Sequence, residues 1–230
     1  MYSIWTVLLL VGLGFASSII WLLFYLRQDR NPEPKVLIIK TFLMGMILTP
    51  WAVLAQLLIV SRGAEAESVT FFLWAALIEE TIKLLAVRYI VMNDPNFDEP
   101  VDAMIYMIVA ALGFAAIENI LVLFNTIPEG INIAFQLWLL RFFGATLLHV
   151  LSSALVGYFL ALAWFYHKHS KILILIGLIL GTIFHFTFNI ILVSFSPVTA
   201  LVYTSVALVL MLYLIFILFS KIKERREVAR

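Results

Sequence analysis

The sequence predicts an all-α membrane protein, a polytopic bundle of about seven transmembrane helices. Hydrophobic residues make up 64% of the 230 positions and charged residues 13%, whereas an ordinary soluble domain has roughly 45–50% and 25%. The apolar residues fall into long segments separated by polar, proline-containing breaks. Lysine and arginine gather in alternate breaks, as they do in the cytoplasmic loops of multi-pass proteins.

Each predicted span has the roughly 20 apolar residues that are needed to cross a bilayer. The seven segments lie near residues 3–26, 36–60, 68–92, 101–125, 136–166, 171–194 and 198–219. The first lacks a preceding basic region and is about twice as long as the apolar core of a signal peptide, which predicts a retained helix. We expect one transmembrane domain, residues 1–220, followed by a basic cytoplasmic tail, residues 221–230.

The positive charges predict the direction of insertion. Arg62 lies alone in one set of breaks, and Arg141 lies near the outer edge of the fifth span. The other set and the C-terminus hold 12 of the 15 Lys and Arg residues, namely Arg27, Arg30, Lys35, Lys40, Arg88, Lys168, Lys171, Lys221, Lys223, Arg225, Arg226 and Arg230. Because basic loops face the cytoplasm, we expect the N-terminus outside, the C-terminus inside and the basic tail against the lipid bilayer.

Charge and cysteine content exclude several other classes. The 15 Lys and Arg residues against 14 Asp and Glu residues leave a net charge of +1, which gives no reason to expect a nucleic acid partner. The chain has no cysteine, so disulfides, thiolate metal sites and a cysteine nucleophile are excluded. Its chemistry must therefore depend on carboxylates, histidines, hydroxyls or a lysine.

Ionisable side chains occur inside four of the predicted spans, where a charge costs about 2.5–3.5 kcal/mol. The intramembrane polar residues are Glu79, Glu80 and Lys83 in the third span, Glu118 and Asn119 in the fourth, Arg141 and His149 in the fifth, and His185 and Asn189 in the sixth. At 1.5 Å per residue, Glu79, Glu118, His149 and His185 lie about 10–16 Å below the outer ends of their helices. A common depth on four helices predicts one shared site in the outer half of the membrane.

Spacing within the helices indicates which side chains share a face. Glu79 and Lys83 are four residues apart and lie on one face, while Glu80 points about 100° away. We therefore expect Lys83 to pair with one of the two carboxylates. His185 and Asn189 are also four residues apart, so an imidazole and an amide could donate two hydrogen bonds to a developing oxyanion.

The predicted site needs charge compensation. Its three carboxylates and one lysine sum to −2 when the histidines are neutral, and an apolar interior disfavours uncompensated charge. Protons, a protonated His149 or His185, Arg141 or a bound divalent cation could each compensate. Two histidines with one or two glutamates form an acceptable zinc set, although the spacing lacks the His-Glu-x-x-His motif.

Structural roles compete with catalytic ones at several positions. Lys83 could form a structural salt bridge, and Asn119 could hydrogen-bond a neighbouring helix. Arg141 could extend to the outer interface or hold a substrate near the outer mouth of the site. Small residues that indicate close helix packing are Ser152, Ser153, Gly177 and Gly181.

Five motifs, in order along the chain, resemble those of the PrsW-type intramembrane proteases. Glu79-Glu80-Thr81-Ile82-Lys83 resembles the E-E-x-x-K motif of this family. The other similar segments are Asp29–Pro34 in the first loop, Phe97–Asp102 with Gly113–Asn119, His149, and His185 with Asn189. The family is related to the CAAX-prenyl endopeptidases, which implies a helical bundle with a membrane-embedded Glu/His site.

The resemblance also implies roles for these residues. Glu79 would be the general base that activates water, and His185 with Asn189 would form the oxyanion hole. Glu118 stands where the CAAX enzymes have a histidine, which leaves His149 or a metal to supply the missing electrophile. The implied catalytic set is Glu79, Glu80, Glu118, His149, His185 and Asn189, with Lys83 and Asn119 in support.

The implied function is the extracytoplasmic site-1 cut in a membrane-anchored regulator, such as an anti-sigma factor, that starts a stress response in a bacterial or archaeal membrane. The substrate would be a single-span membrane protein, and no cofactor is required when glutamate activates the water. One alternative is a zinc-dependent hydrolase that uses His149, His185, Glu79 and Glu118 as ligands. Another is a proton-coupled transporter, although a proton relay would string its residues through the membrane. The sequence leaves the oligomeric state open.

Overall fold

The structure is a computed structural model in which residues 3–27, 31–66 and 68–229 are described. Every regular element in these ranges is helical. The main helices are α1 (Ile4–Leu26), α2 (Lys35–Ser61), α3 (Val69–Ile90), α4 (Pro100–Thr126), α5 (Ile131–Phe143), α6 (Ala145–Phe165), α7 (Ser170–Ser194) and α8 (Pro197–Ala229). Short 3-10 turns, η1 (Ile127–Glu129) and η2 (His167–His169), precede α5 and α7. The predicted all-α class is confirmed.

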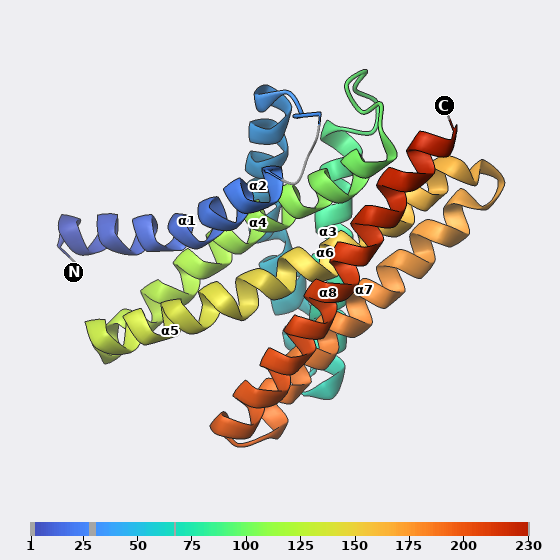
Figure 1. The fold of residues 1–230 in the computed structure, drawn as a ribbon. Helices are drawn as coiled ribbons and strands as arrows, with labels where there is room; N and C mark the ends of the chain where they lie inside the picture. Colours follow the sequence, from blue (N-terminus) through green and yellow to red (C-terminus); the bar gives the residue numbers. More distant parts are fainter. Residues whose placement is uncertain (1–2, 28–30, 67, 230) are drawn as a thin grey trace.

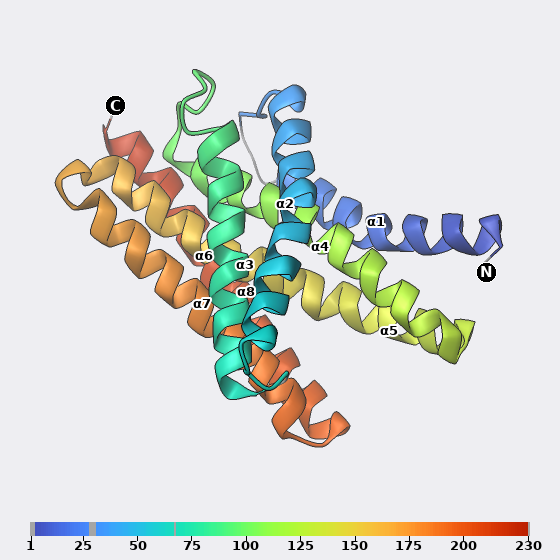
Figure 2. The ribbon, with the colours of Figure 1, turned by 180° about the vertical axis from the view of Figure 1, so that it is seen from behind.

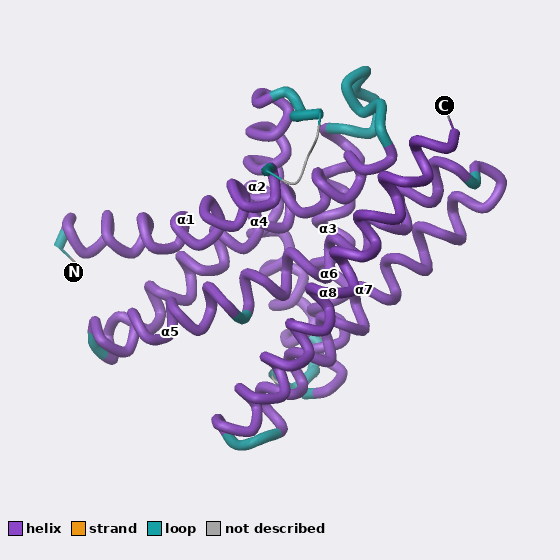
Figure 3. Tube along the Cα trace, in the orientation of Figure 1, coloured by secondary structure: helices purple, strands orange, loops and turns teal. Residues whose placement is uncertain are grey.

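Five of the predicted spans each match one helix within a few residues, the last continues ten residues further than predicted, and the fifth is divided. It begins earlier than predicted and consists of α5 and α6, which are separated at Gly144. A Cβ added to Gly144 would lie 2.6 Å from the carbonyl oxygen of Leu140, so the missing side chain lets the backbone make this break. Figure 3 shows the break as a short loop segment within one long rod.

Six helical stretches are long and apolar enough to cross a membrane: α1, α2, α4 with η1, α5 with α6, α7 with η2, and α8. The remaining helix, α3, is not in this set and carries the charged residues Glu79, Glu80, Lys83 and Arg88 within its 22 residues. It packs against α2 and α7, and Figure 2 shows it between these two helices. The chain is therefore a multi-pass membrane protein whose most polar helix buries Glu79, Glu80 and Lys83 on the face that packs on its neighbours.

Helices α4 and α6 form the centre of the bundle. They pack along each other, with α1 and α2 against α4 and with α7 against α6, as Figure 1 shows. Glycines permit the closest approaches: a Cβ on Gly113 would lie 2.0 Å from the Phe42 carbonyl oxygen of α2, and one on Gly181 of α7 would lie 2.6 Å from Val156 of α6. These contacts confirm that the small residues predicted as packing signals lie between helices.

Local sequence sets where the helices begin. Ser68 caps α3 by accepting a hydrogen bond from the Phe71 backbone at 3.2 Å. At the start of α4, Glu99 and Asp102 form a capping box around Pro100. The Phe97–Asp102 motif therefore has a structural role at the beginning of the central helix.

The loops separate into two ends, which agrees with the alternation of charged breaks. In Figure 1 the beginning of α2, the α3–α4 loop, the α6–α7 turn and the C-terminal end of α8 lie toward the top and right, whereas the beginning of α1 and the other connections lie toward the left and bottom. The first group contains the breaks that are rich in Lys and Arg. Which group faces the cytoplasm stays a prediction.

The C-terminal tail, predicted as a separate segment, continues the last helix. The 33 residues of α8 give a rod of about 50 Å at 1.5 Å per residue, longer than the roughly 30 Å hydrocarbon core of a bilayer. Ile222 is fully buried, and Arg225 donates a hydrogen bond to the Tyr166 hydroxyl at 3.2 Å. The beginning of the tail thus packs on the bundle.

Candidate active site

Four helices bring ionisable side chains into one buried cluster, as the common depth predicts. Glu79, Glu80 and Lys83 come from α3, and Glu118 comes from α4. His149 comes from α6 and His185 from α7. The described contacts join all six side chains into a single network. Residues separated by more than 100 positions thus form one site.

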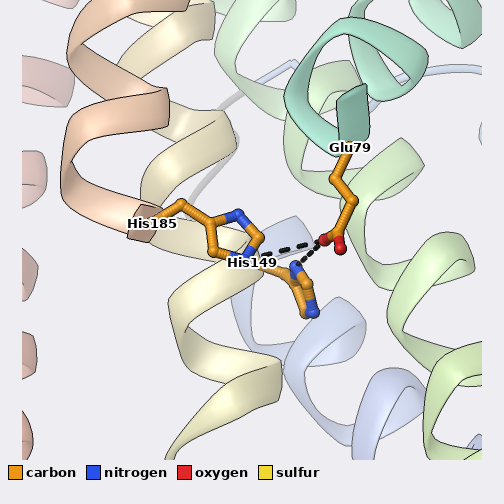
Figure 4. Close-up of side chains that lie close together, drawn as sticks. All are labelled: Glu79, His149 and His185. Carbon is orange, nitrogen blue, oxygen red and sulfur yellow. Dashed lines mark ion pairs between the residues drawn. The ribbon is translucent and has the colours of Figure 1, made fainter. Parts of the chain in front are cut away.

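Glu79 faces both histidines (Figure 4). Its Oε2 lies 3.8 Å from Nδ1 of His149 and 3.6 Å from Nε2 of His185. Its Oε1 accepts a hydrogen bond from Nε2 of Gln56 on α2 at 3.0 Å. Oε2 is buried and has no hydrogen-bond partner among the described residues. Ligand atoms of Glu79, His149 and His185 lie within 4.8 Å of one another, so the three side chains could hold a metal ion.

Glu80, the adjacent residue, has a different environment. Its Oε1 accepts hydrogen bonds from Nζ of Lys83 at 2.7 Å, from Oγ of Ser152 at 2.9 Å and from Nδ1 of His185 at 3.0 Å. Its Oε2 accepts from Oγ of Ser153 at 2.8 Å. The side chain is completely buried. Because four donors occupy its acceptor sites, Glu80 is held as an anchor and has little capacity to take a proton from water.

Carboxylates also fix which nitrogen of each imidazole carries its proton. Nε2 of His149 lies 2.6 Å from Oε2 of Glu118, and Nδ1 of His185 lies 3.0 Å from Oε1 of Glu80. An ionised carboxylate only accepts hydrogen bonds, so the network assigns the protons to these two nitrogens. The remaining nitrogens, Nδ1 of His149 and Nε2 of His185, keep their lone pairs and lie 3.8 Å and 3.6 Å from Oε2 of Glu79.

Lys83 is completely buried beside this cluster. Its ammonium lies 2.7 Å from Oε1 of Glu80 and 2.9 Å from Nδ1 of His149. It also lies over the ring of Phe114, 4.9 Å from the centroid. The expected pairing of Lys83 with one of the two glutamates is therefore made to Glu80, three residues earlier.

A second branch of the network runs outward from Glu118. Oε2 of Glu118 lies 3.0 Å from Nη2 of Arg141 on α5. Nε of Arg141 donates to Oδ1 of Asn119 at 2.6 Å, and Nδ2 of Asn119 donates to Ser17 at 2.8 Å and Thr146 at 3.0 Å. Arg141 thus turns inward instead of extending to the interface, and Asn119 links helices α1, α4, α5 and α6.

The cluster is close to electrical balance. Glu79, Glu80 and Glu118 oppose Lys83 and Arg141, which leaves a formal charge of −1 when both histidines are neutral. Arg141 therefore reduces the imbalance of −2 that the sequence predicts. The remaining negative charge favours a cation at the site.

Two predicted features do not join the cluster. Asn189 lies one turn after His185 and is partly buried, but within the described ranges no hydrogen bond connects it to the other site residues. The loop motifs lie at the opposite end, where Asn31 donates to Glu99 at 2.7 Å and Tyr106 donates to Glu33 at 2.5 Å. Asp29 and Arg30 of the first motif lie outside the described residues.

Comparison with known proteins identifies the family to which these features belong. Residues 33–218 match the family described as "PrsW family intramembrane metalloprotease". The chain belongs to the PrsW family. Proteins named "Protease PrsW" are similar: that of Geobacillus kaustophilus is 32% identical over 70% of both chains, and that of Oceanobacillus iheyensis is 30% identical over 83% of this chain and 86% of its own. That of Bacillus subtilis is 27% identical over 81% and 84%. No solved structure matches the chain.

Membership of the PrsW family confirms the predicted resemblance and makes the chain an intramembrane protease of bacterial type. The predicted enzyme class is therefore confirmed over the alternative of a proton-coupled transporter. The family's description as a metalloprotease also agrees with the clustered Glu79, His149 and His185.

Three polar residues of this PrsW site, Gln56, Ser152 and Ser153, are not predicted from the sequence as contacts of the glutamates. Ser152 and Ser153 were interpreted only as packing residues, yet both donate to Glu80. They lie three and four residues after His149, hence on its face of the helix, which is the signal that could have found them. Gln56 is the one polar side chain between residues 51 and 60 of an apolar span, and it binds Glu79.

The two adjacent glutamates of the PrsW motif should differ in their effect on stability. Glu80→Gln leaves the buried Lys83 ammonium without its anionic partner, so we expect the free energy of unfolding to fall by about 3–5 kcal/mol. Glu79→Gln keeps an acceptor for Gln56 and should change it by about 1 kcal/mol or less. Thermal and denaturant unfolding of both variants in detergent measures the difference. Equal destabilisation would contradict the distinct environments of the two carboxylates.

Proposed function

We propose that the chain is a zinc-dependent intramembrane endopeptidase that cuts a single-span membrane protein, with Glu79, His149 and His185 as the metal ligands. One observation carries the proposal: Nδ1 of His149 and Nε2 of His185 lie 3.8 Å and 3.6 Å from a buried oxygen of Glu79 that has no hydrogen-bond partner among the described residues. The sequence favours a metal-free Glu79 base and gives zinc as the alternative, whereas this geometry supports the metal-dependent mechanism.

The donor set and its spacing support zinc. Two histidines and one glutamate form a ligand set of catalytic zinc sites, in which a fourth position stays open. Bonds of about 2.0–2.1 Å in a tetrahedron separate neighbouring ligand atoms by roughly 3.3 Å. Oε2 of Glu79 lies 3.6 Å from His185 and 3.8 Å from His149, so small side-chain movements would complete the geometry.

The surroundings of the two histidines give independent support. Metal-binding histidines usually donate their second ring N–H to a carboxylate or carbonyl, which fixes the tautomer and the ring orientation. Glu118 holds His149 in this way at 2.6 Å, and Glu80 holds His185 at 3.0 Å. The formal charge of −1 on the cluster also attracts a cation to this place.

A bound zinc ion supplies a Lewis acid that lowers the pKa of a water molecule and polarises a carbonyl. The chain's own residues position the reactants around it. Glu118 has the most exposed carboxylate of the three, with 30% of its side chain accessible. Its contacts to His149 and Arg141 both use Oε2, which leaves Oε1 to accept a proton from water and later to return it to the leaving amine.

The remaining predicted residues receive narrower roles. Both ring nitrogens of His185 face carboxylates, so it fits a ligand better than an oxyanion donor. Asn189 lies one turn away on the same helix, has no hydrogen bond to the site residues within the described ranges, and could hold a substrate carbonyl. Glu80 orients His185 and anchors Lys83, and Arg141 fixes the carboxylate of Glu118.

The position of the cluster supports a cut on the extracytoplasmic side. Glu79 is ten residues from the start of α3, or about 15 Å. Glu118 and His185 are eight and nine residues from the ends of α4 and α7. Glu118 and His185 therefore lie nearer the end of the bundle that is poor in Lys and Arg, and Glu79 lies at the middle of α3. Together with the family resemblance, this supports a membrane-anchored regulator such as an anti-sigma factor as substrate, and regulated proteolysis in a stress response as the biological role.

Metal removal should abolish hydrolysis if this proposal is correct. We expect purified wild-type protein to lose at least about 100-fold activity on a single-span substrate after strong chelation and to recover it with one equivalent of zinc. Glu79→Gln should be inactive with zinc present, because the ligand carboxylate is lost. Arg88→Gln, on the exposed end of the same helix, serves as the active control. Full activity in metal-depleted protein would favour the metal-free scheme with Glu79 as base.

The predicted orientation places the cut outside the cytoplasm, and it can be tested because the chain has no cysteine. We expect Arg62→Cys, in the α2–α3 connection, to react with an impermeant maleimide added to intact cells. Lys168→Cys, in the α6–α7 turn, should react only after the membrane is opened. The reverse pattern would place the active site in the cytoplasmic half and exclude an extracytoplasmic cut.

A further inference from the structure

The buried ammonium of Lys83 makes a contact that the proposed function does not use. Its Nζ lies 2.9 Å from Nδ1 of His149, at hydrogen-bond distance, although it already has an anionic partner in Glu80. An ammonium has donors and no acceptor. The contact therefore requires the lone pair of Nδ1, which agrees with the proton that Glu118 assigns to Nε2 of the same ring.

The same lone pair is the one that His149 offers to a metal. Nδ1 is the ring nitrogen that faces Oε2 of Glu79 at 3.8 Å, whereas Nε2 is engaged with Glu118 at 2.6 Å. A lone pair can accept a hydrogen bond or coordinate a metal, but it cannot do both at once. The contact of Lys83 with His149 and the coordination of a metal by His149 are therefore mutually exclusive.

We infer that Lys83 is an internal competitor for the metal: its ammonium caps Nδ1 of His149, and a divalent cation binds only when this ammonium withdraws. The inference rests on the proposed metal site of Glu79, His149 and His185. The competitor sets the affinity of the site, because every metal ion that binds must displace one charge-assisted hydrogen bond. The Lys83 ammonium lowers the affinity of the site for the metal. When no metal is bound, it provides a hydrogen-bond donor for the buried lone pair of Nδ1 of His149.

The structure provides a place for the displaced ammonium. Lys83 remains 2.7 Å from Oε1 of Glu80 and 4.9 Å from the centroid of the Phe114 ring, and both contacts attract a cation. A lysine has a flexible four-carbon stem and a compact charged group, so it can leave His149 through rotation of its terminal bonds. The competing contact can thus open without separating the buried ion pair.

Cobalt binding by the purified full-length chain in detergent tests this inference. Co²⁺ is titrated into wild-type protein and the variants Lys83→Gln and Lys83→Met, and its visible absorption reports coordination. We expect the dissociation constant to fall at least about tenfold in both variants, which corresponds to about 1.4 kcal/mol. Arg88→Gln removes a cation from an exposed position of the same helix and should leave the constant within about twofold of wild type. Unchanged or weaker binding in the Lys83 variants would overturn the inference.

Failure of the metal site itself gives a different result. If wild-type protein binds no Co²⁺, or if His149→Ala leaves binding unchanged, the proposed ligand set is wrong, and the competition is wrong with it. If the Lys83 variants do not fold, NMR of wild-type protein labelled with ¹⁵N-lysine replaces them. The ammonium signal that is protected from exchange should then shift when zinc is added. A protected signal that stays unchanged at full zinc occupancy would show that no displacement occurs.

Discussion

The buried carboxylate of Glu80 is the interaction on which the rest of the site depends. It accepts hydrogen bonds from Lys83 on its own helix, from Ser152 and Ser153 on α6, and from His185 on α7. One side chain therefore fixes the relative positions of three helices and the orientation of one imidazole. In a low-dielectric interior such contacts are strong when every partner is present and costly when one is missing. Glu80 also orients the imidazole of His185 that faces the adjacent Glu79.

The membrane explains why the charges are arranged in a closed network. Charged groups inside a bilayer face the bundle interior and pair with one another. Here α3 carries most of these charges on the face that packs against its neighbours, including α2 and α7, while apolar residues on α3 and on the other helices face outward. Arg141 reaches the cluster from the short helix α5 and holds the outermost carboxylate, Glu118. A protease that must hydrolyse a peptide bond within the membrane thus keeps its polar groups in one nearly neutral layer.

Periodicity, hydropathy and depth were sufficient to predict the helices and the common layer, because insertion into a bilayer requires long apolar segments and penalises each stray charge. They did not predict the break at Gly144, since it depends on close backbone contacts that hydropathy does not report. The depth of Glu79 and Glu80 was predictable, whereas their different roles depend on Gln56, Ser152 and Ser153 from other helices. The inward turn of Arg141 likewise depends on Glu118 and Asn119, partners that sequence spacing cannot assign across helices.

The central claim is that Glu79, His149 and His185 hold a metal ion. X-ray absorption spectroscopy at the zinc edge of purified protein, loaded with one equivalent of zinc, tests it most directly. The account predicts a coordination shell of nitrogen and oxygen atoms with two imidazoles at about 2.0–2.1 Å, reduced to one imidazole in His149→Ala or His185→Ala. A zinc ion without imidazole ligands, or a protein that retains no zinc, would contradict it.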